Sequence, residues 1–414
     1  SSANGSVWSA YTALYRMLAM TQAYKDPNAE GFGDPRLVDA VGRALLHWDR
    51  VNPGNTNWWE TEIGESIAMG RISMFLGSAL SPEAFDVALK HNTGKLDPVG
   101  ANGAWRTSNY IFEALSTRDI AKVKEGFATI VATIAVDHSG TVQEAVQPDG
   151  SFWAHGAQLY SEGYGMVLFT YAALWSDVAR GTGLAFTRDQ LDSIAFYFIS
   201  GTRWLIRGEI GMLYLNYRPP KTVNDITSHA SEFIEPLQRM ARTDALYATA
   251  YQAVLDGVLG KTETNGVTGN KYFWRSEFSS HLRDGYGIFT RLNSSRTFGA
   301  ELRTSYRDEL GNPVYWNAMG STAIQVNNRE YLDLGPAFDW WHYPGVTAPN
   351  VKRTERGFEN RGRNGDGASF TGGTSNGEFG VSVLTLDTAG TNAQKSYFSF
   401  DQGMVALGAG IAST

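Results

Sequence analysis

The spacing of apolar residues changes once along this chain, and that change constrains the fold more than any other feature. Up to about residue 260 the apolar spacing is helical, as over residues 63–74, where the steps are four, three and four. From about residue 270 the period becomes two, as over residues 379–385. The sequence therefore predicts an α+β chain with a helical domain over 1–262 and an antiparallel β-sheet domain over 263–414, the latter a sandwich.

The helical part reads as a series of helices joined by short polar loops. In addition to 63–74, we expect helices at about 7–25, 35–50, 82–91, 103–115, 117–135, 157–180, 188–206 and 228–258. Ser81 before Pro82 is a typical helix start. Thr187 with Gln190 forms a capping box, and Ser116 with Asp119 is a weaker start signal. Nine or ten helices in series predict antiparallel pairs arranged as a toroid or partial barrel.

Composition excludes several classes of protein. The 414 residues are 43% apolar and 13% aromatic, too apolar for a disordered chain. No apolar run is long enough to span a membrane. The net charge of −7 argues against a nucleic-acid partner. The absence of cysteine excludes disulfides, cysteine-ligated zinc and a cysteine nucleophile.

Three segments are dense in polar and aromatic residues, at 57–65, 100–106 and 149–165. The adjacent tryptophans of the first either face a cleft, where their rings stack on sugars, or fill a core or interface. The asparagine of the second, before a glycine, suggests a tight turn or a helix start, although it could simply cap a helix. In the third, a histidine and a tyrosine lie nine residues apart in a glycine-rich loop, where function is common, although a lone histidine is more often structural.

Familiar catalytic and metal motifs are missing. The chain contains no HExxH, no Walker loop and no GxSxG elbow. The stretch 364–369 faintly resembles a calcium loop but lacks the downstream acidic ligand, which favours a plain turn.

Taken together and in this order, the three segments resemble polysaccharide lyase family 8, which holds the hyaluronate, chondroitin AC and xanthan lyases. The family's NWW-x-x-EIG pattern matches 57–64, its GAN turn matches 100–102, and its DGSF-x-x-H…Y-x-x-GYG run matches 149–165. Two later stretches, 339–347 and 395–408, resemble its D-W-x-x-x-PG-T-T and KSWF-x-FD…VALG segments. The match at 149–165 is specific, whereas the other matches would be weak alone.

The resemblance implies an incomplete α/α toroid followed by antiparallel sheets, and cleavage of uronate-containing polysaccharides by β-elimination. It implies that Tyr164 takes the proton from C5 of the uronate and returns one to the leaving oxygen on C4. A phenol is a weak base at neutral pH, so a nearby cation or preorganised site is expected. His155 is expected to assist or to orient the sugar. Asn102 is expected to hydrogen-bond the carboxylate and so stabilise the enolate-like intermediate.

Substrate binding is expected from the same segments. The resemblance assigns Trp58 and Trp59 to an aromatic patch, and Trp105 lies in the second segment. The cleft must be locally positive for an acidic polymer, and Arg106 is a candidate. No metal or organic cofactor is required by the implied mechanism.

Two correspondences are looser. Arg218 aligns with the first arginine of a family pair, whereas the second is replaced or shifted, with Lys221 nearby as a candidate cation. A family glutamate that follows an SSR strand points to Glu301, but the asparagine expected three residues later is Thr304. These departures leave the polymer open among hyaluronan, chondroitin, xanthan and other uronate types.

Alternative functions remain at this stage. An α/α-toroid glycoside hydrolase needs two carboxylates flanking the bond. The available carboxylates are Glu60, Glu62, Glu65, Asp149 and Glu162. A non-catalytic carbohydrate-binding protein is the other alternative. For the lyase we expect secretion. The start at Ser1 without methionine or a signal-peptide pattern suggests a processed or trimmed N-terminus. We also expect a fragment or nicked chain with a separate C-terminal portion, because the family usually continues through further sheets.

Overall fold

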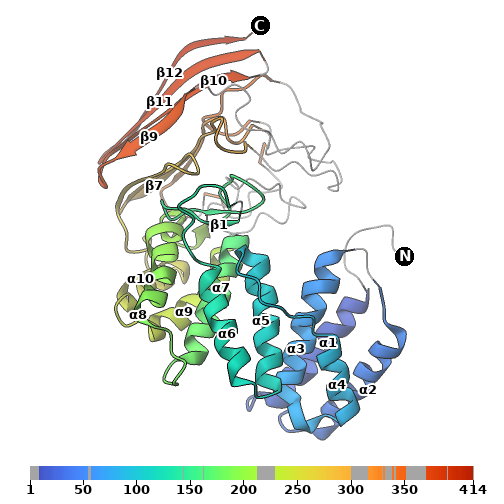
Figure 1. Cartoon of the computed structure of the whole chain (residues 1–414). Coiled ribbons are helices and arrows are strands. Elements are labelled where there is room, and N and C mark those ends of the chain that lie inside the picture. The colour runs from blue at the N-terminus through green and yellow to red at the C-terminus, as the bar shows by residue number, and fades with distance from the viewer. Residues whose placement is uncertain are drawn as a thin grey trace. The chain divides into compact units, whose positions relative to one another are not determined.

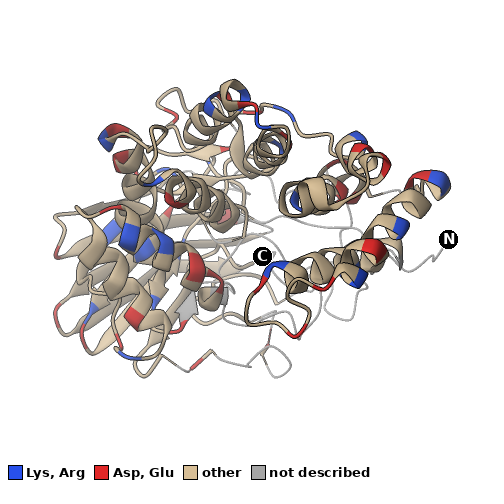
Figure 2. Ribbon diagram, turned by 90° about the horizontal axis from the view of Figure 1, so that it is seen from below, with Lys and Arg blue, Asp and Glu red and all other residues tan. Residues whose placement is uncertain are grey.

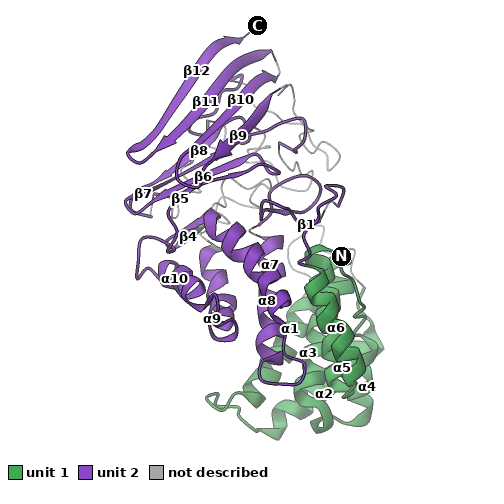
Figure 3. Ribbon diagram, turned by 60° about the vertical axis from the view of Figure 1, so that its left-hand side comes forward, with its two compact units in different colours: residues 1–133 green, residues 134–414 purple. Residues whose placement is uncertain are grey.

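The chain folds into two compact units, residues 1–133 and 134–414 (Figures 1 and 3). The computed structural model describes residues 9–54, 57–142, 144–161, 163–211, 229–299, 316–328, 330–331, 338–339, 342–350, 370–388 and 390–413.

The first unit is helical in the residues described. Its elements are α1 (Ser9–Lys25), α2 (Pro35–Val51), the π-helix η1 (Glu60–Gly64), α3 (Glu65–Leu76), the 3-10 turn η2 (Gly77–Ala79), α4 (Pro82–Lys90), α5 (Gly100–Ser116) and α6 (Ile120–Ala132). Helix α1 packs on α2 and α3, α2 packs on α4, and α3 packs on α5, which in turn packs on α6. Helix α3 is therefore the central element of this unit.

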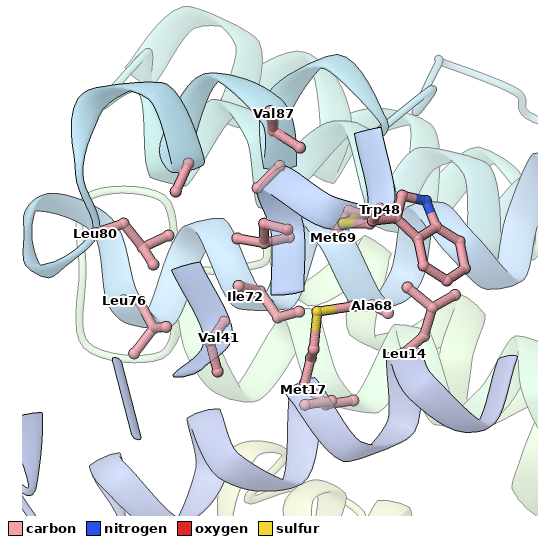
Figure 4. Packing of buried hydrophobic residues seen from close by; sticks show 14 of the residues in the cluster. Leu14, Met17, Val41, Trp48, Ala68, Met69, Ile72, Leu76, Leu80 and Val87 are labelled. Atoms are coloured by element: carbon pink, nitrogen blue, oxygen red, sulfur yellow. The ribbon is translucent and has the colours of Figure 1, made fainter. Parts of the chain in front are cut away.

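Burial agrees with that position. Figure 4 shows Leu14 and Met17 from α1 beside Val41 from α2 and Ile72 and Leu76 from α3. These side chains are at most 3% exposed. Because neighbours surround α3, its serines and glycine are buried as well as its apolar residues.

The expected helix starts are confirmed where the capping residues are described. Ser81 accepts a hydrogen bond from the backbone N–H of Ala84 at 3.2 Å, with proline at the first position. Thr187 forms its capping box with both hydrogen bonds present. At α6 the cap is Asp119, while Ser116 is the last residue of α5.

The second unit begins with a short hairpin and continues through helices. Its helical portion contains β1 (Ala145–Val146), β2 (Phe152–Trp153), α7 (Tyr164–Ala179), α8 (Arg188–Ala195), the π-helix η3 (Phe196–Gly201), the 3-10 helix η4 (Thr202–Leu205), β3 (Ile206–Arg207), β4 (Ile210–Gly211), the 3-10 helix η7 (His229–Phe233), α9 (Ile234–Thr243) and α10 (Ala248–Val258). Helix α9 packs on both α7 and α10.

Two predicted helices in this portion were wrong in their limits. Residues 157–161 and Gly163 are not helical, and the helix begins only at Tyr164, after Gly163 with φ +65°. The expected helix 228–258 is two helices, because Asp244 ends α9 with a non-helical backbone (ψ 88°). Its carboxylate accepts hydrogen bonds from the backbone N–H of Leu246 and from the Arg188 guanidinium.

Two antiparallel meanders follow. One runs in the order β5 (Gly269–Phe273), β6 (Phe278–Arg283), β7 (Tyr286–Arg291) and β8 (Ser321–Gln325), and the other consists of β9 (Thr371–Ser375), β10 (Gly380–Thr388), β11 (Thr391–Phe400) and β12 (Gly403–Ser413). The predicted period of two is confirmed in β10. Its fully buried face carries Leu384 and Leu386, whereas Val381 and Val383 are half-buried.

The first meander is covered on both faces. One cluster joins Phe273, Phe278 and Phe289 of this sheet to Leu205 of the helical portion. Another joins its Tyr272 to residues of the second meander, including Leu384 and Tyr397. The α+β architecture of a helical N-terminal part followed by antiparallel sheets is thus confirmed. The domain limit between 262 and 263 stays a prediction.

Candidate active site

The histidine and tyrosine singled out in the glycine-rich segment lie together in the second unit. The ring centroids of His155 and Tyr164 are 4.9 Å apart in an edge-to-face arrangement. A third ring, that of Tyr160, lies 5.6 Å from His155 and 5.4 Å from Tyr164. His155 and Tyr164 are half-buried, whereas Tyr160 is only 4% exposed. Two titratable rings therefore reach solvent, packed against a buried third ring.

The turn before β2 fixes the start of this loop. The buried Asp149 carboxylate accepts hydrogen bonds from the Ser151 backbone and hydroxyl at 3.0 and 2.6 Å, and from the Arg275 backbone at 2.6 Å. Gly150 has φ +86°. A Cβ on Gly201 would lie 2.0 Å from the Gly150 carbonyl oxygen, so the turn and the end of η3 touch backbone to backbone. The positive φ of Gly150, together with the 3.0 Å that would separate its Cβ from the Gly201 Cα, explains the glycine of the Asp-Gly-Ser sequence.

Backbone bonds then hold the two ends of the loop together. Tyr160 donates its N–H to the carbonyl of Phe152 at 2.7 Å and accepts from the N–H of Gly165 at 2.9 Å. A Cβ on Gly165 would lie 2.2 Å from the Tyr197 hydroxyl. His155 itself has φ +57°, in the left-handed region that few non-glycine residues adopt. The histidine's direction is thus set by an uncommon backbone conformation.

Tyr164 is the first residue of α7. Backbone N–H groups at a helix N-terminus carry partial positive charge and stabilise a nearby anion. Gly163, the capping residue, offers no side-chain acceptor to those groups. The first turn of α7 therefore receives no side-chain cap from Gly163.

The tryptophan pair lies in the first unit, immediately before the π-helix η1. Trp59 is half-buried and makes an edge-to-face contact with Trp105 of α5, with centroids 5.2 Å apart. Trp58 is 47% exposed. Single-turn π-helices occur often at functional sites. The pair thus divides, with one ring packed against Trp105 and the other exposed.

Arg106 lies beside Trp58. Its guanidinium is 5.8 Å from the Trp58 ring centroid and pairs with Asp97 at 3.0 Å and Glu62 at 3.1 Å. Two carboxylates thus balance its charge. Figure 2 shows acidic and basic positions interspersed along the described helices.

Asn102 lies in the first turn of α5, whose N-cap residue, Val99, supplies no side-chain hydrogen bond. Gly100 has φ +59°, and a Cβ on Gly103 would lie 2.5 Å from the carbonyl oxygen of Asp97. The Asn102 Oδ1 is buried and has no hydrogen-bond partner among the described residues. The helix start is therefore confirmed, whereas the capping role is wrong, because Val99 occupies the N-cap position and the Asn102 Oδ1 has no partner among the described residues.

The expected site residues fall into three sets. His155 and Tyr164 come together in the second unit, while Asn102, Trp58, Trp59, Trp105 and Arg106 belong to the first. Arg218, Lys221 and Glu301 lie outside the described residues, as does Thr304.

Sequence reasoning missed two aromatic residues at these places. Tyr160 packs on both catalytic candidates, and its only signal was its position inside the 149–165 segment. Tyr11 of α1 lies 6.5 Å from Trp59. Nothing in the sequence separated Tyr11 from an ordinary helical aromatic.

Most carboxylates considered for a hydrolase have structural partners. Glu65 accepts from the Trp48 indole at 2.8 Å and contacts His91 at 2.7 Å. Glu62 pairs with Arg106, and Asp149 holds its turn. Glu60 has an interaction of its own, and Glu162 is outside the described residues.

Within the described ranges, no three His, Asp or Glu side chains gather in a way suited to a metal ion. Among the same residues, no helix has the length and apolar character needed to cross a membrane.

Family models account for most of the chain. The model of the polysaccharide lyase family 8 N-terminal alpha-helical domain matches residues 3–207, and that of the family's super-sandwich domain matches residues 268–414. The chain belongs to polysaccharide lyase family 8.

Particular relatives include chondroitinase-AC of Pedobacter heparinus, 26% identical over 98% of this chain and 58% of that protein, and xanthan lyase of Bacillus sp. (strain GL1), 22% identical over 97% and 47%. Solved structures show the same fold. A chondroitinase AC lyase studied with oligosaccharides has a TM-score of 0.81 at 24% identity, covering 97% of this chain and 59% of that one. A Paenibacillus xanthan lyase has a TM-score of 0.82 at 20% sequence identity, and the match covers 100% of this chain and 44% of that one. The chain spans about half the length of the relatives it matches.

Proposed function

We propose that this chain cleaves a uronate-containing polysaccharide by β-elimination. The observation that carries the proposal is the pairing of His155 and Tyr164, 4.9 Å apart on a loop fixed at both ends. Family membership supports it, since the relatives are named chondroitinase-AC, hyaluronate lyase and xanthan lyase. The proposed partner is an acidic polysaccharide of the hyaluronan, chondroitin or xanthan type.

In this proposal Tyr164, as the phenolate, removes the proton from C5 of the uronate. The electron pair forms the C4–C5 double bond, the C4–O bond breaks, and the same hydroxyl protonates the leaving oxygen. The position of Tyr164 at the N-terminus of α7 supports its role as the base. His155 orients the sugar or assists proton removal, and Asn102 binds the carboxylate, which stabilises the enolate-like intermediate.

The remaining residues are proposed to bind substrate or assist. Trp58, Trp59 and Trp105 present aromatic rings to the sugars, and the exposed face of Trp58 supports this. Arg106, with its ion pairs to Asp97 and Glu62, is proposed to contribute through Trp58 as well as through charge. The roles of Arg218, Lys221 and Glu301 rest on the sequence resemblance.

The test is ultraviolet absorbance while the protein acts on hyaluronan, chondroitin, xanthan and glucuronan in turn. Elimination leaves a conjugated C4–C5 double bond, so absorbance should rise on one polymer. New reducing ends without absorbance would instead support a hydrolase. Binding with neither product would support the non-catalytic alternative.

Tyr164→Phe should abolish turnover and leave polymer binding nearly unchanged, because only the ionisable hydroxyl is lost. The matched control is Tyr110→Phe, which removes a hydroxyl that donates to Glu125 at 3.0 Å in the first unit. Full activity of Tyr164→Phe, or equal losses in both variants, would contradict the assignment.

We also propose that the protein acts outside the cell, where uronate-containing polysaccharides occur. We further propose that the natural protein includes a separate C-terminal portion. Recovery of activity from the culture medium would support the first part. An intact-mass measurement of the natural protein tests the second, since a fully active species of 45.4 kDa would contradict it.

A further inference from the structure

Four aromatic rings form a continuous stripe in the first unit. The rings are those of Tyr15, Tyr11, Trp59 and Trp105, and successive centroids are 4.5, 6.5 and 5.2 Å apart. They come from α1, the residue before η1, and α5. We call this set the aromatic stripe. Trp59 and Trp105 already belong to the proposed substrate-binding residues, whereas the two tyrosines do not.

Glycine at position 64 provides the space for the middle of the stripe. A Cβ on Gly64 would lie 2.7 Å from the Tyr11 ring and 3.0 Å from the Trp59 ring. Both rings therefore close over the same bare backbone, at the last residue of η1. Because both rings pack on Gly64, the contact between Tyr11 and Trp59 is part of the packing of α1 against η1.

The end of the stripe is exposed. Tyr15 is 57% exposed, although the neighbouring Leu14 and Met17 of α1 are 1% and 2% exposed and lie in the core. The buried side of α1 is therefore packed against the core without any contribution from Tyr15. The next residue, Arg16, is also exposed and has no ion-pair or hydrogen-bond partner among the described residues.

Flat apolar rings at a surface, edged by polar groups, suit ligands that combine an apolar face with hydroxyls. A pyranose ring has that character, and a uronate adds a carboxylate that attracts an unpaired guanidinium. The spacing of the rings is comparable to the length of one sugar unit. The stripe thus offers successive contacts to a polysaccharide running past Trp59 toward α1.

We propose that Tyr11 and Tyr15 form a further subsite, which binds the polysaccharide at least one sugar beyond those held by Trp58, Trp59 and Trp105. Tyr15 stacks on a sugar ring, Tyr11 supports it from below, and Arg16 attracts a uronate carboxylate. The inference rests on the proposed function for its ligand class. Its consequence is a preference for long chains over short oligosaccharides.

The experiment measures binding by calorimetry in the Tyr164→Phe background, so that no substrate is consumed. The probes are tetrasaccharides and dodecasaccharides of hyaluronan and chondroitin. Tyr15→Ala should weaken dodecasaccharide binding about two- to tenfold, the range expected for one aromatic contact. Tetrasaccharide affinity should not change. Tyr15→Trp should restore the affinity for the long chain.

Phe32→Ala is the matched control, because Phe32 is also 57% exposed but does not belong to the stripe. It should leave both affinities unchanged. Unaltered dodecasaccharide binding in Tyr15→Ala would overturn the subsite, as would an equal loss for both lengths or the same loss in Phe32→Ala. Failure of the proposed function is distinguished by a separate measurement: the wild-type protein would then bind these chains without producing ultraviolet absorbance. If the Tyr164→Phe protein, without any further substitution, binds neither probe, both the subsite and the proposed function are overturned.

Discussion

Lys395 of β11 offers a quantitative test of the packing between the two meanders. Its side chain is almost fully buried, and its ammonium group donates to the carbonyl oxygens of Met319, at 3.4 Å, and Gly345. No carboxylate pairs with it among the described residues. Burial without a counter-charge lowers the pKa of Lys395 from 10.5 to about 8.

The sign of the resulting pH dependence follows from proton binding. Below pH 8 both the folded and unfolded chains hold the proton, so the cost of burying the charge is constant. Between pH 8 and 10.5 the unfolded lysine keeps its proton and the folded one has lost it, so stability rises with pH. From pH 7 to 9.5 the gain in the free energy of unfolding is ~2 kcal/mol.

The assay compares wild type with Lys395→Met, which keeps the length of the side chain and cannot titrate. Guanidinium unfolding is followed by tryptophan fluorescence at several pH values in this window. Trp316 serves as a reporter because it packs in the cluster that contains Met319 and Tyr397, between the two meanders. The difference in stability, wild type minus variant, should rise by ~2 kcal/mol. Tyr397 is buried with its pKa raised, but it is present in both proteins and cancels.

Lys124→Met is the control, because Lys124 is exposed on α6. Its difference from wild type should stay flat with pH. A flat difference for Lys395→Met as well would refute the reasoning, since it would mean that the buried group keeps its proton. A falling difference would mean that the folded state favours the charge.

Three further predictions concern stability and are measured as shifts in denaturant midpoint. Gly201→Ala should destabilise the second unit by at least about 2 kcal/mol, because its Cβ would lie 2.0 Å from the Gly150 carbonyl oxygen; an unchanged midpoint would mean that the turn can move aside. Arg188→Ala should cost about 3–5 kcal/mol by leaving the fully buried Asp244 carboxylate without its cation, and a loss below about 1 kcal/mol would show that this is only a surface pair. Ser81→Ala should cost about 1 kcal/mol by removing the cap of α4, with no loss expected if water replaces the hydroxyl.

The sequence allowed the fold to be predicted where local signals and packing agree. Capping residues such as Ser81 and Thr187 act on their own helix, so their position in the sequence was enough. The prediction was wrong at 157–163 because Leu159 is apolar for another reason: it packs in the cluster with Phe273 and Phe278 of the first meander. A contact with strands more than 100 residues away leaves no local periodicity.

The candidate site was predictable to a similar degree. His155 lies in a short loop that leads directly to Tyr164, the first residue of α7, so their proximity followed from the segment that contains them. Two other contacts join segments far apart in the chain: Tyr11 packs on Gly64, and Gly201 closely approaches Gly150. Their residues carry no spacing signal, and only the packed structure reveals them.

The left-handed backbone at His155 affects how any substitution there is interpreted. Alanine at φ +57° both deletes the imidazole and disfavours the conformation that aims the loop. A loss of activity would then mix lost chemistry with a displaced loop that also carries Tyr164. Asparagine tolerates this region far better than other non-glycine residues. His155→Asn is therefore the substitution whose kinetics report on the imidazole alone, and the gap between it and His155→Ala measures what the loop geometry contributes.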